Sequence, residues 1–375
     1  MTSVSNERKS GAESISLSGS LGGAAFVLTG LLLGALVCNV LALIYPFLEF
    51  SAAFKGKEFY SIPLTISLMW DFGLYAAAIL VVAFSLTFPF IKLAMLLATI
   101  WVPMSHLLRR RMLVSLRNLG RWSLLDVFIV VTILVLADDQ IFVGAVPKVG
   151  VTLFLVAICT SMLTCEILDS MSPDGASADP LPAVPTRHSL YFDSGWTFWL
   201  MLLLFLATII SLLAAIGLPY FHISQFLLKH KAYSVIESIL ALAQSDSLAF
   251  ALTLMIFLVV FPLARISLMA AEGFVPMSHD NRARLTWWSG IIGAWSMLDV
   301  FVLALLLFML EGDRLIAFDV RGGLYMLIIS VGLYYLTLFM HTSFVRQASR
   351  NRKKASGSLR AAWLRKGAPR HEPDY

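Results

Sequence analysis

Two cations and two carboxylates recur at one fixed spacing and are the residues of this chain best suited to chemistry. Lys92 and Arg265 are 173 positions apart, and each follows a Phe-Pro pair by three residues inside a long apolar run. Asp126 and Asp299 are separated by the same 173 positions. Charged groups inside apolar segments normally face a partner or a water-filled cavity, because burying them alone costs free energy. The two pairs therefore predict a polar network in each half of the chain.

Each of these residues also has a simpler interpretation. The cations lie roughly ten residues, or about 15 Å, from the end of their helix, and a long side chain could carry its charge to the lipid headgroups. Each aspartate stands three residues after a serine, as in Ser123-x-x-Asp126, which is the spacing of a helix-capping box. An acidic group near a helix N-terminus is favourable without any further role. Capping and pairing with the cation can also operate together.

Prolines and threonines repeat in the same register, the prolines as predicted helix kinks and the threonines as predicted members of the polar network. Pro89 and Pro262 have no amide hydrogen, so each is predicted to kink its helix and free carbonyl oxygens beside the cation. A kink that serves packing alone is the alternative. Thr164 and Thr337 could supply hydroxyl groups, although a threonine in a helix commonly bonds its own backbone.

Metal and cofactor chemistry finds no support in the sequence. The three cysteines, Cys38, Cys159 and Cys165, lack the spacing of a disulfide framework or a metal site and are predicted to be small packing residues. His106 and His279 lie beside arginines at the predicted membrane rim, which favours interface hydrogen bonding over ligation. The chain has no P-loop and no G-x-S-x-G, H-E-x-x-H or C-x-x-C motif. We therefore predict no enzyme activity, no cofactor and no metal.

The elements that must position these residues are membrane-spanning helices. Apolar residues make up 59% of the 375 residues and charged residues 14%, and the mean hydropathy is +0.83, outside the range of soluble domains. A spanning helix needs about 20 mostly apolar residues. Eight stretches meet this requirement, at about 20–48, 73–104, 123–143, 147–168, 195–221, 248–275, 295–311 and 322–345. The sequence therefore predicts an all-α polytopic membrane protein.

Basic residues predict the orientation in the membrane. If the N-terminus is cytoplasmic, the cytoplasmic flanks and loops contain 19 Lys and Arg residues, and the opposite side contains seven. An excess of basic residues marks the cytoplasmic side, so both termini are predicted to lie inside. The net charge of +5 comes from these flanks and favours anionic lipid headgroups over nucleic acid as partner.

The chain is a tandem repeat with a shift of 173 residues. The pentapeptide VPMSH occurs at 102–106 and 275–279, where it is predicted to close the second span of each copy on the cytoplasmic face. The motif W-S-[LM]-L-D-V-F occurs at 122–128 and 295–301, and its tryptophan is predicted at the interface where the third span begins. Four spans in each copy mean that both copies enter the membrane from the same side.

The repeat also predicts the domain organisation. The outward-facing segment of the first copy, 57–68, is predicted to form a strand or hairpin, and its counterpart 230–240 a strand or an amphipathic helix. The predicted units are a disordered cytoplasmic tail (1–19), a first four-span repeat (20–168), a cytoplasmic linker (169–194), a second four-span repeat (195–345) and a basic cytoplasmic tail (346–375).

These repeated features resemble the paraquat-inducible protein A (PqiA) family. The similarity rests on two four-span copies, each with a Phe-Pro pair, a V-P-x-x-x turn and W-S-[ML]-L-D-V-F, and it covers about residues 20–345. It implies two tandem four-helix modules, tetraspanin-like and in parallel orientation, with small periplasmic β-rich loops. Many members carry zinc ribbons of C-x-x-C pairs ahead of each half, and this chain has none.

The resemblance further implies a function in lipid transport. Members act in the Gram-negative inner membrane beside a periplasmic MCE-domain protein that forms a tunnel for lipids. This implies an inner-membrane subunit that moves phospholipid between the membrane and the tunnel protein and so maintains the outer membrane. The alternative is a proton- or ion-coupled secondary transporter of a small amphiphilic solute. The residues that would line a lipid-handling cavity are Arg265, Asp299 and Thr337, with Lys92, Asp126 and Thr164 as their first-half equivalents.

Overall fold

The chain is a mostly helical, multi-pass membrane protein. The computed structural model describes residues 19, 22–52, 56–73, 75–125, 127–130, 143–171, 191, 195–224, 230–244, 248–312, 318–320 and 322–365. Within these residues, seven helical stretches are long and apolar enough to cross a bilayer: Gly23–Ile44, Val82–Trp101, Val149–Met171, Gly195–Gly217, Leu248–Phe274, Asp280–Leu307 and Gly322–Gln347. Most of the stretch 123–143, predicted as the third of eight spans, lies outside the described residues.

The first half contains four long helical segments and a small sheet. Helix α2 ends before Pro46, because the residue preceding a proline is driven out of the helical conformation. Its described elements are α2 (Gly23–Ile44), β1 (Leu48–Ala52), β2 (Gly56–Tyr60), α3 (Ile62–Asp71), α4 (Tyr75–Val81), the π-helical segment η1 (Val82–Thr87), α5 (Phe88–Trp101), α6 (His106–Gly120), the 3₁₀ turn η2 (Arg121–Leu124), β3 (Val143–Pro147) and α8 (Val149–Met171).

The second half repeats this order, in close agreement with the shift of 173. Helices α3 and α11, for example, begin and end at equivalent residues, and so do the two π-helical segments. The elements of the second half are α10 (Gly195–Gly217), β4 (Phe221–Ser224), β5 (His230–Tyr233), α11 (Val235–Gln244), α12 (Leu248–Leu254), η3 (Met255–Val260), α13 (Phe261–Phe274), α14 (His279–Trp295), α15 (Leu298–Gly312), β6 (Phe318–Val320) and α16 (Gly322–Arg365).

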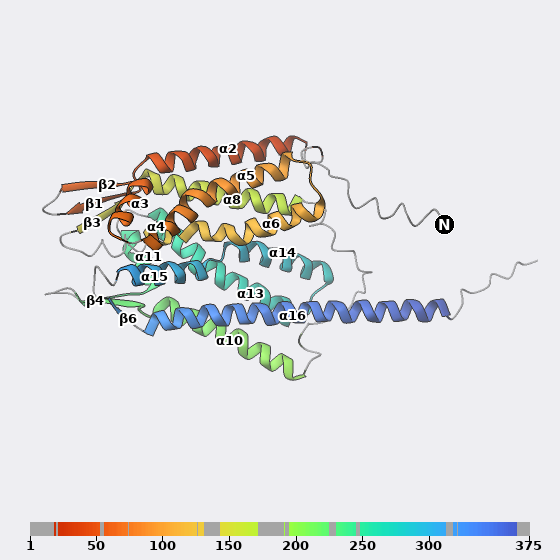
Figure 1. Cartoon of the computed structure of the whole chain (residues 1–375). Helices are drawn as coiled ribbons and strands as arrows, with labels where there is room; N and C mark the ends of the chain where they lie inside the picture. The colour runs from red at the N-terminus through yellow and green to blue at the C-terminus, as the bar shows by residue number, and fades with distance from the viewer. Residues whose placement is uncertain are drawn as a thin grey trace, which may run out of the picture.

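Each half carries one three-stranded antiparallel sheet. The strand orders are β2-β1-β3 and β5-β4-β6, and the central strands pair in matching register, with Phe50 opposite Glu58 and Ile223 opposite Lys231. Gly56, the first residue of β2, has a φ of 82°, a left-handed conformation that glycine adopts readily. Both sheets lie at the same end of the molecule, so the two halves run in the same direction (Figure 1). We call this the sheet end, and the opposite end the turn end.

The outward segments combine the two predicted structures. In both halves a strand is followed directly by a ten-residue helix, α3 or α11. The strand prediction for 57–68 was therefore correct only as far as Tyr60, and the two alternatives for 230–240 both occur. Helix α11 begins with a capping box, in which Ser234 N–H donates to Glu237 Oε2 and Glu237 N–H donates to Ser234 Oγ.

The repeated pentapeptide VPMSH forms the tight turn between two antiparallel helices at the turn end. Helices α5 and α13 end just before it, and α6 and α14 begin at its histidine. Its serine caps the next helix in both copies: Ser105 Oγ accepts from Leu108 N–H at 3.4 Å, and Ser278 Oγ accepts from Asn281 N–H at 3.5 Å.

The predicted start of the seventh span at Trp295 was wrong. Helix α14 begins directly after the turn, and the candidate span, which includes the interruption at Ser296 and Met297, covers Asp280 to Leu307. Trp295 therefore lies within the span and stacks on Phe257 of η3, with ring centroids 5.8 Å apart; Trp122 stacks on Phe84 of η1 in the same way. Arg282 and Arg284, near the start of this helix, suggested a loop, so its first turns were not predicted.

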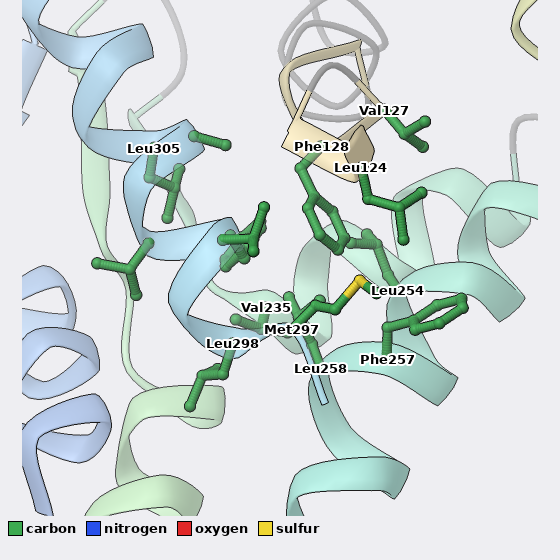
Figure 2. Packing of buried hydrophobic residues seen from close by; sticks show 14 of the residues in the cluster. Leu124, Val127, Phe128, Val235, Leu254, Phe257, Leu258, Met297, Leu298 and Leu305 are labelled. Atoms are coloured by element: carbon green, nitrogen blue, oxygen red, sulfur yellow. The ribbon is translucent and has the colours of Figure 1, made fainter. Parts of the chain in front are cut away.

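The two halves join through one continuous apolar core. Phe128 and Phe301 are equivalent residues, both almost fully buried, and their rings meet edge to face with centroids 5.7 Å apart. Figure 2 shows Leu124 of the first half near Leu254 and Phe257 of the second. A contact between equivalent residues is expected at a pseudo-twofold axis. The helix α16 continues beyond the predicted end of the repeat at residue 345 as far as Arg365 (Figure 1).

Candidate functional site

Two neighbouring helices of each half are interrupted at the same level. In the second half, the π-helical segment η3 precedes Pro262, and α14 and α15 are separated by Ser296 and Met297. The Met297 N–H donates to the Phe257 carbonyl of η3 at 3.5 Å, so the break and the π-helical segment face each other. In the first half, η1 and η2 occupy the equivalent positions. Irregular backbone at membrane depth is tolerated where protein buries it or where it lines a cavity.

The two repeated prolines stand at the second position after these π-helical segments. Phe88 N–H bonds the Ala83 carbonyl and Phe261 N–H bonds the Ile256 carbonyl, five residues back in each case. Proline cannot donate to the helix ladder, and a π-turn is a common way to absorb such a disturbance at functional sites. The predicted helix kinks at Pro89 and Pro262 thus coincide with a change of helix type.

Arg265 reaches the helix break of its own half. Its Nη1 donates to Tyr334 Oη at 3.0 Å and to the Gly293 carbonyl at 3.5 Å, and Tyr334 Oη donates in turn to Ser296 Oγ at 3.2 Å. Gly293 makes room for the guanidinium, since a Cβ at this position would lie 2.3 Å from Arg265 Cζ. We call Arg265, Tyr334 and Ser296 the arginine chain.

The other two predicted residues of the second half, Asp299 and Thr337, also involve α16: Asp299 bonds a residue of this helix, and Thr337 lies on it. Asp299 Oδ2 accepts from Tyr335 Oη at 2.6 Å. Thr337 is buried, and its hydroxyl bonds the Leu333 carbonyl of its own helix and lies 2.7 Å from Thr208 Oγ1 on α10. Arg265 and Asp299 are thus bonded to consecutive tyrosines of α16.

Lys92 lies deep inside the first half. Only 1% of its surface is exposed, and its Nζ sits 3.0 Å from the point where a Cβ of Gly120 would be, so it points into the bundle rather than along its outside. Within the described residues, neither Lys92 Nζ nor Ser123 Oγ has a hydrogen-bond partner. Thr164 donates to the Thr160 carbonyl, and Asp126 lies outside the described residues.

A small pocket opens beside Lys92 where the two halves meet. Arg117 at its edge is held by Asp169 at 2.9 Å and by Glu166 at 3.8 Å. Residues of the first half supply most of the lining, and Trp295 of the second half closes one side. The lining includes Lys92, Leu116, Arg117, Met162, Glu166 and Trp295.

A buried polar cluster in the second half was missed by the sequence analysis. Glu272 Oε2 lies 3.2 Å from His341 Nε2, and Glu272 Oε1 accepts from Thr286 Oγ1 at 2.7 Å. Tyr191, from the segment between the halves, places its hydroxyl 2.7 Å from His341 Nδ1 and its ring over Gly273. We call Glu272, His341, Tyr191 and Thr286 the Glu272 cluster. The signal was a lone acidic residue at the end of an apolar run.

The sheet of the first half contains a clear electrostatic site outside the membrane spans. Glu49 of β1 is nearly buried, pairs with Lys57 of β2 at 2.8 Å and also pairs with Lys148, next to β3. These two ammonium groups, Lys148 first, hold the pKa of Glu49 below its ordinary value. Tyr220, at the start of the second-half sheet, has its pKa raised by burial.

Comparison with known families assigns both halves of the chain. The model of the family described as paraquat-inducible protein A matches residues 27–172 and again residues 200–349. A comparison with curated proteins and one with solved structures returned no match. Both matched regions contain the four-segment unit seen in the fold, including the π-helical segment and the turn. The two matches together cover more than half of the chain, which therefore belongs to the paraquat-inducible protein A family.

Proposed function

We propose that this chain is the inner-membrane subunit of an MCE-type lipid transport system in a Gram-negative cell. It would move phospholipid between the inner membrane and a periplasmic tunnel protein, with both termini in the cytoplasm and the two sheets in the periplasm. Membership of the family and the two-module architecture support this proposal. The sheets then stand where a periplasmic MCE-domain partner would dock.

The arginine chain carries the proposal. A cation this far inside an apolar span is expensive, by about 2.5–3.5 kcal/mol on insertion scales, and is usually retained for a function. Arg265 has its fork fixed by Tyr334 beside a helix break, and its Nε has no hydrogen-bond partner in the described part of the chain. A preorganised guanidinium is well suited to bind the phosphate of a lipid.

The experiment compares variants that keep or remove the charge. In a strain that depends on this chain for its outer-membrane barrier, Arg265→Met is expected to impair the barrier while the amount of protein in the membrane stays near normal. Arg265→Lys should retain part of the function, because it keeps the positive charge and loses only the planar, two-pronged arrangement of guanidinium donors. Collapse of the protein level in Arg265→Met would mean that the arginine is needed for folding instead.

A proton- or ion-coupled transporter of a small amphiphilic solute is the second candidate. The Glu272 cluster favours it, because a buried carboxylate and histidine in contact can exchange a proton. Glu272→Gln should then abolish any dependence of transport on the proton gradient. If lipid transfer persists unchanged in that variant, the cluster has no part in coupling.

A further inference from the structure

Three exposed aromatic residues surround the connection between α3 and α4, which lies at the sheet end of the first half (Figure 1). Trp70 and Tyr75 are each 53% exposed, and Phe72 is 76% exposed. The rings of Trp70 and Tyr75 meet edge to face, with centroids 5.0 Å apart. We call Trp70, Phe72 and Tyr75 the aromatic turn. An exposed apolar patch of this kind marks a surface that contacts a membrane or another protein.

The backbone of the aromatic turn is fixed by hydrogen bonds. Helix α3 ends at Asp71, and the Phe72 N–H still bonds the Leu68 carbonyl at 2.9 Å. Gly73 has a φ of 77°, a conformation that glycine adopts without strain, and its N–H bonds the Trp70 carbonyl at 3.1 Å. The exposure of the three rings therefore follows from a defined helix end rather than from a loose loop.

The aromatic turn continues the outward face of the second candidate span. Helices α4 and α5 and the π-helical segment η1 between them form one helical run, 75–101. Exposed residues recur at every fourth position along this run, at Tyr75, Ile79, Ala83, Thr87 and Ile91, which places them on one side of it. Because Val82–Trp101 is long and apolar enough to cross a bilayer, this side faces lipid. The aromatic turn is thus continuous with a surface that lipid covers.

The length of the helical run places Tyr75 at a boundary of the bilayer. The run has the same extent as its second-half equivalent Leu248–Phe274, which contains 27 residues. Such a run spans about 40 Å, and a bilayer with its headgroups is about 40–45 Å thick. Trp101, at the opposite end, is 44% exposed. Tryptophan and tyrosine are enriched at both interfaces, because each combines an apolar ring with a polar tip.

The second half does not repeat the aromatic turn. The residues at the equivalent positions are Ala243, Ser245 and Leu248, and those between them are Gln244, Asp246 and Ser247. This segment is therefore mostly polar. A feature that the shared fold requires would be expected in both halves, so the aromatic turn serves a purpose particular to the first half.

We infer that the aromatic turn is a membrane anchor, whose three rings insert into the headgroup region of the leaflet at the sheet end. It fixes the first half to this leaflet, whereas the equivalent segment of the second half stays in water. The partner of this surface is the lipid itself. The inference does not rest on the proposed function, because it holds whichever solute the protein moves.

Spin labels at equivalent positions measure how deeply each half is inserted. Asp71→Cys and Gln244→Cys place a label on the exposed last residues of α3 and α11 and leave the aromatic turn intact. The full-length protein, with its three native cysteines replaced by alanine, is reconstituted alone in phosphatidylcholine vesicles. Each label is tested for collisions with oxygen, which concentrates in lipid, and with a water-soluble nickel chelate. The label at position 71 should meet oxygen more often, and nickel less often, than the label at position 244.

Exchange of the aromatic turn for its second-half counterpart tests the cause of this difference. Trp70→Ala, Phe72→Ser and Tyr75→Leu together should raise the nickel collisions of the label at position 71 toward those at position 244. A label at Phe339, of which 66% is exposed on α16, controls for folding and should be unaffected by the exchange.

Two results would overturn the inference. The first is a label at position 71 that meets the nickel chelate as often as the label at position 244 does. The aromatic turn would then stand in water, as a surface for a protein partner would. The second is an exchange that changes neither the label at position 71 nor that at position 339, because the depth of α3 would then not depend on the three rings.

Discussion

The two halves of this protein share a backbone and differ in their buried polar groups. Both have the same turn, the same π-helical segment and a glycine that accommodates the cation. The second half bonds its cation to a tyrosine and adds the Glu272 cluster. In the first half, Thr99 and Leu168 stand where Glu272 and His341 are, and the cation has no hydrogen bond in the described residues. After duplication, the scaffold has thus been retained while its polar interior has diverged.

This difference shows that the two halves differ in how their buried cations are stabilised. A hydrogen bond to a charged group contributes about 1.5–3 kcal/mol, so the arginine chain rigidifies the second half without any ligand. Among the described residues, the first half has no such hydrogen bond to its cation. The predictions below alter one half at a time, or equivalent positions in both.

The largest effect is expected when the Glu272 cluster is broken. His341→Leu installs the residue of the first half but leaves the Glu272 carboxylate buried without its histidine, which should cost about 4 kcal/mol of unfolding free energy. The double variant His341→Leu with Glu272→Thr matches the first half and should recover most of that loss. Denaturant unfolding of both variants measures the difference. Equal stability of the single and double variants would show that the two residues are not coupled.

A large and symmetric effect is expected at two equivalent glycines. A Cβ at Gly150 would lie 2.6 Å from the Pro46 carbonyl oxygen, and one at Gly323 would lie 2.3 Å from that of Pro219. Because backbone atoms cannot move aside easily, Gly150→Ala and Gly323→Ala should each cost about 3 kcal/mol. Gly332→Ala is the control, since its Cβ would meet nothing within 4 Å. Strongly unequal costs in the two halves would contradict the equivalence of their helix packing.

A moderate effect confined to one half is expected for the arginine chain. Tyr334→Phe removes the hydroxyl that bridges Arg265 and Ser296 and should cost about 2 kcal/mol, as expected for a hydrogen bond to a charged group. Ser161→Ala at the equivalent position should change the unfolding free energy by less than about 0.5 kcal/mol, as for a site without such a bond. Similar losses in both variants would remove the distinction between the halves.

The smallest effect is a pH dependence of the first-half sheet. Because Lys148 and Lys57 hold the pKa of Glu49 below its ordinary value of 4.5, the stabilisation is present above that value and is lost as the pH falls through the lowered pKa. The protection of the β1 amides against hydrogen exchange, relative to the intrinsic exchange rate at each pH, should therefore fall in acid, and Glu49→Gln should flatten this dependence. The second-half sheet has His222 at this position, and an identical acid response there would assign the effect to another group.

The fold was largely predictable from this sequence because the repeat gave two independent views of each element. The turn at VPMSH followed from the shift of 173, whereas a strand was predicted only within 57–68 and, as one of two alternatives, within 230–240, so the other strands of the two sheets were not predicted. The start of α14 was not predictable. Arg282 and Arg284 suggested a loop, whereas the structure has a helix there that is capped by Ser278. Local propensity and capping outweighed the charge pattern.

The two repeated cations of the candidate site could be singled out from the sequence, but their contacts could not. Lys92 and Arg265 stood out as cations in apolar runs, and their burial follows from the glycines opposite them. The partners of Arg265 and Asp299, Tyr334 and Tyr335, could not be inferred, because tyrosines in a membrane helix usually signal only an interface. Pairing across helices depends on packing that a sequence of one chain does not contain.

The most direct test of the account is a photocrosslink beside Arg265. Phe261 lies one helical turn from Arg265 and contacts Trp295, so a benzophenone side chain at this position samples the interior of the second half. The control is Phe339, of which 66% is exposed on the outer face of α16. We predict phospholipid adducts at both positions, with loss of the adduct in the Arg265→Met background only at position 261. Two results would contradict a lipid site built around the buried cation. One is the lack of any adduct at position 261 in the original chain, and the other is an adduct there that Arg265→Met does not reduce.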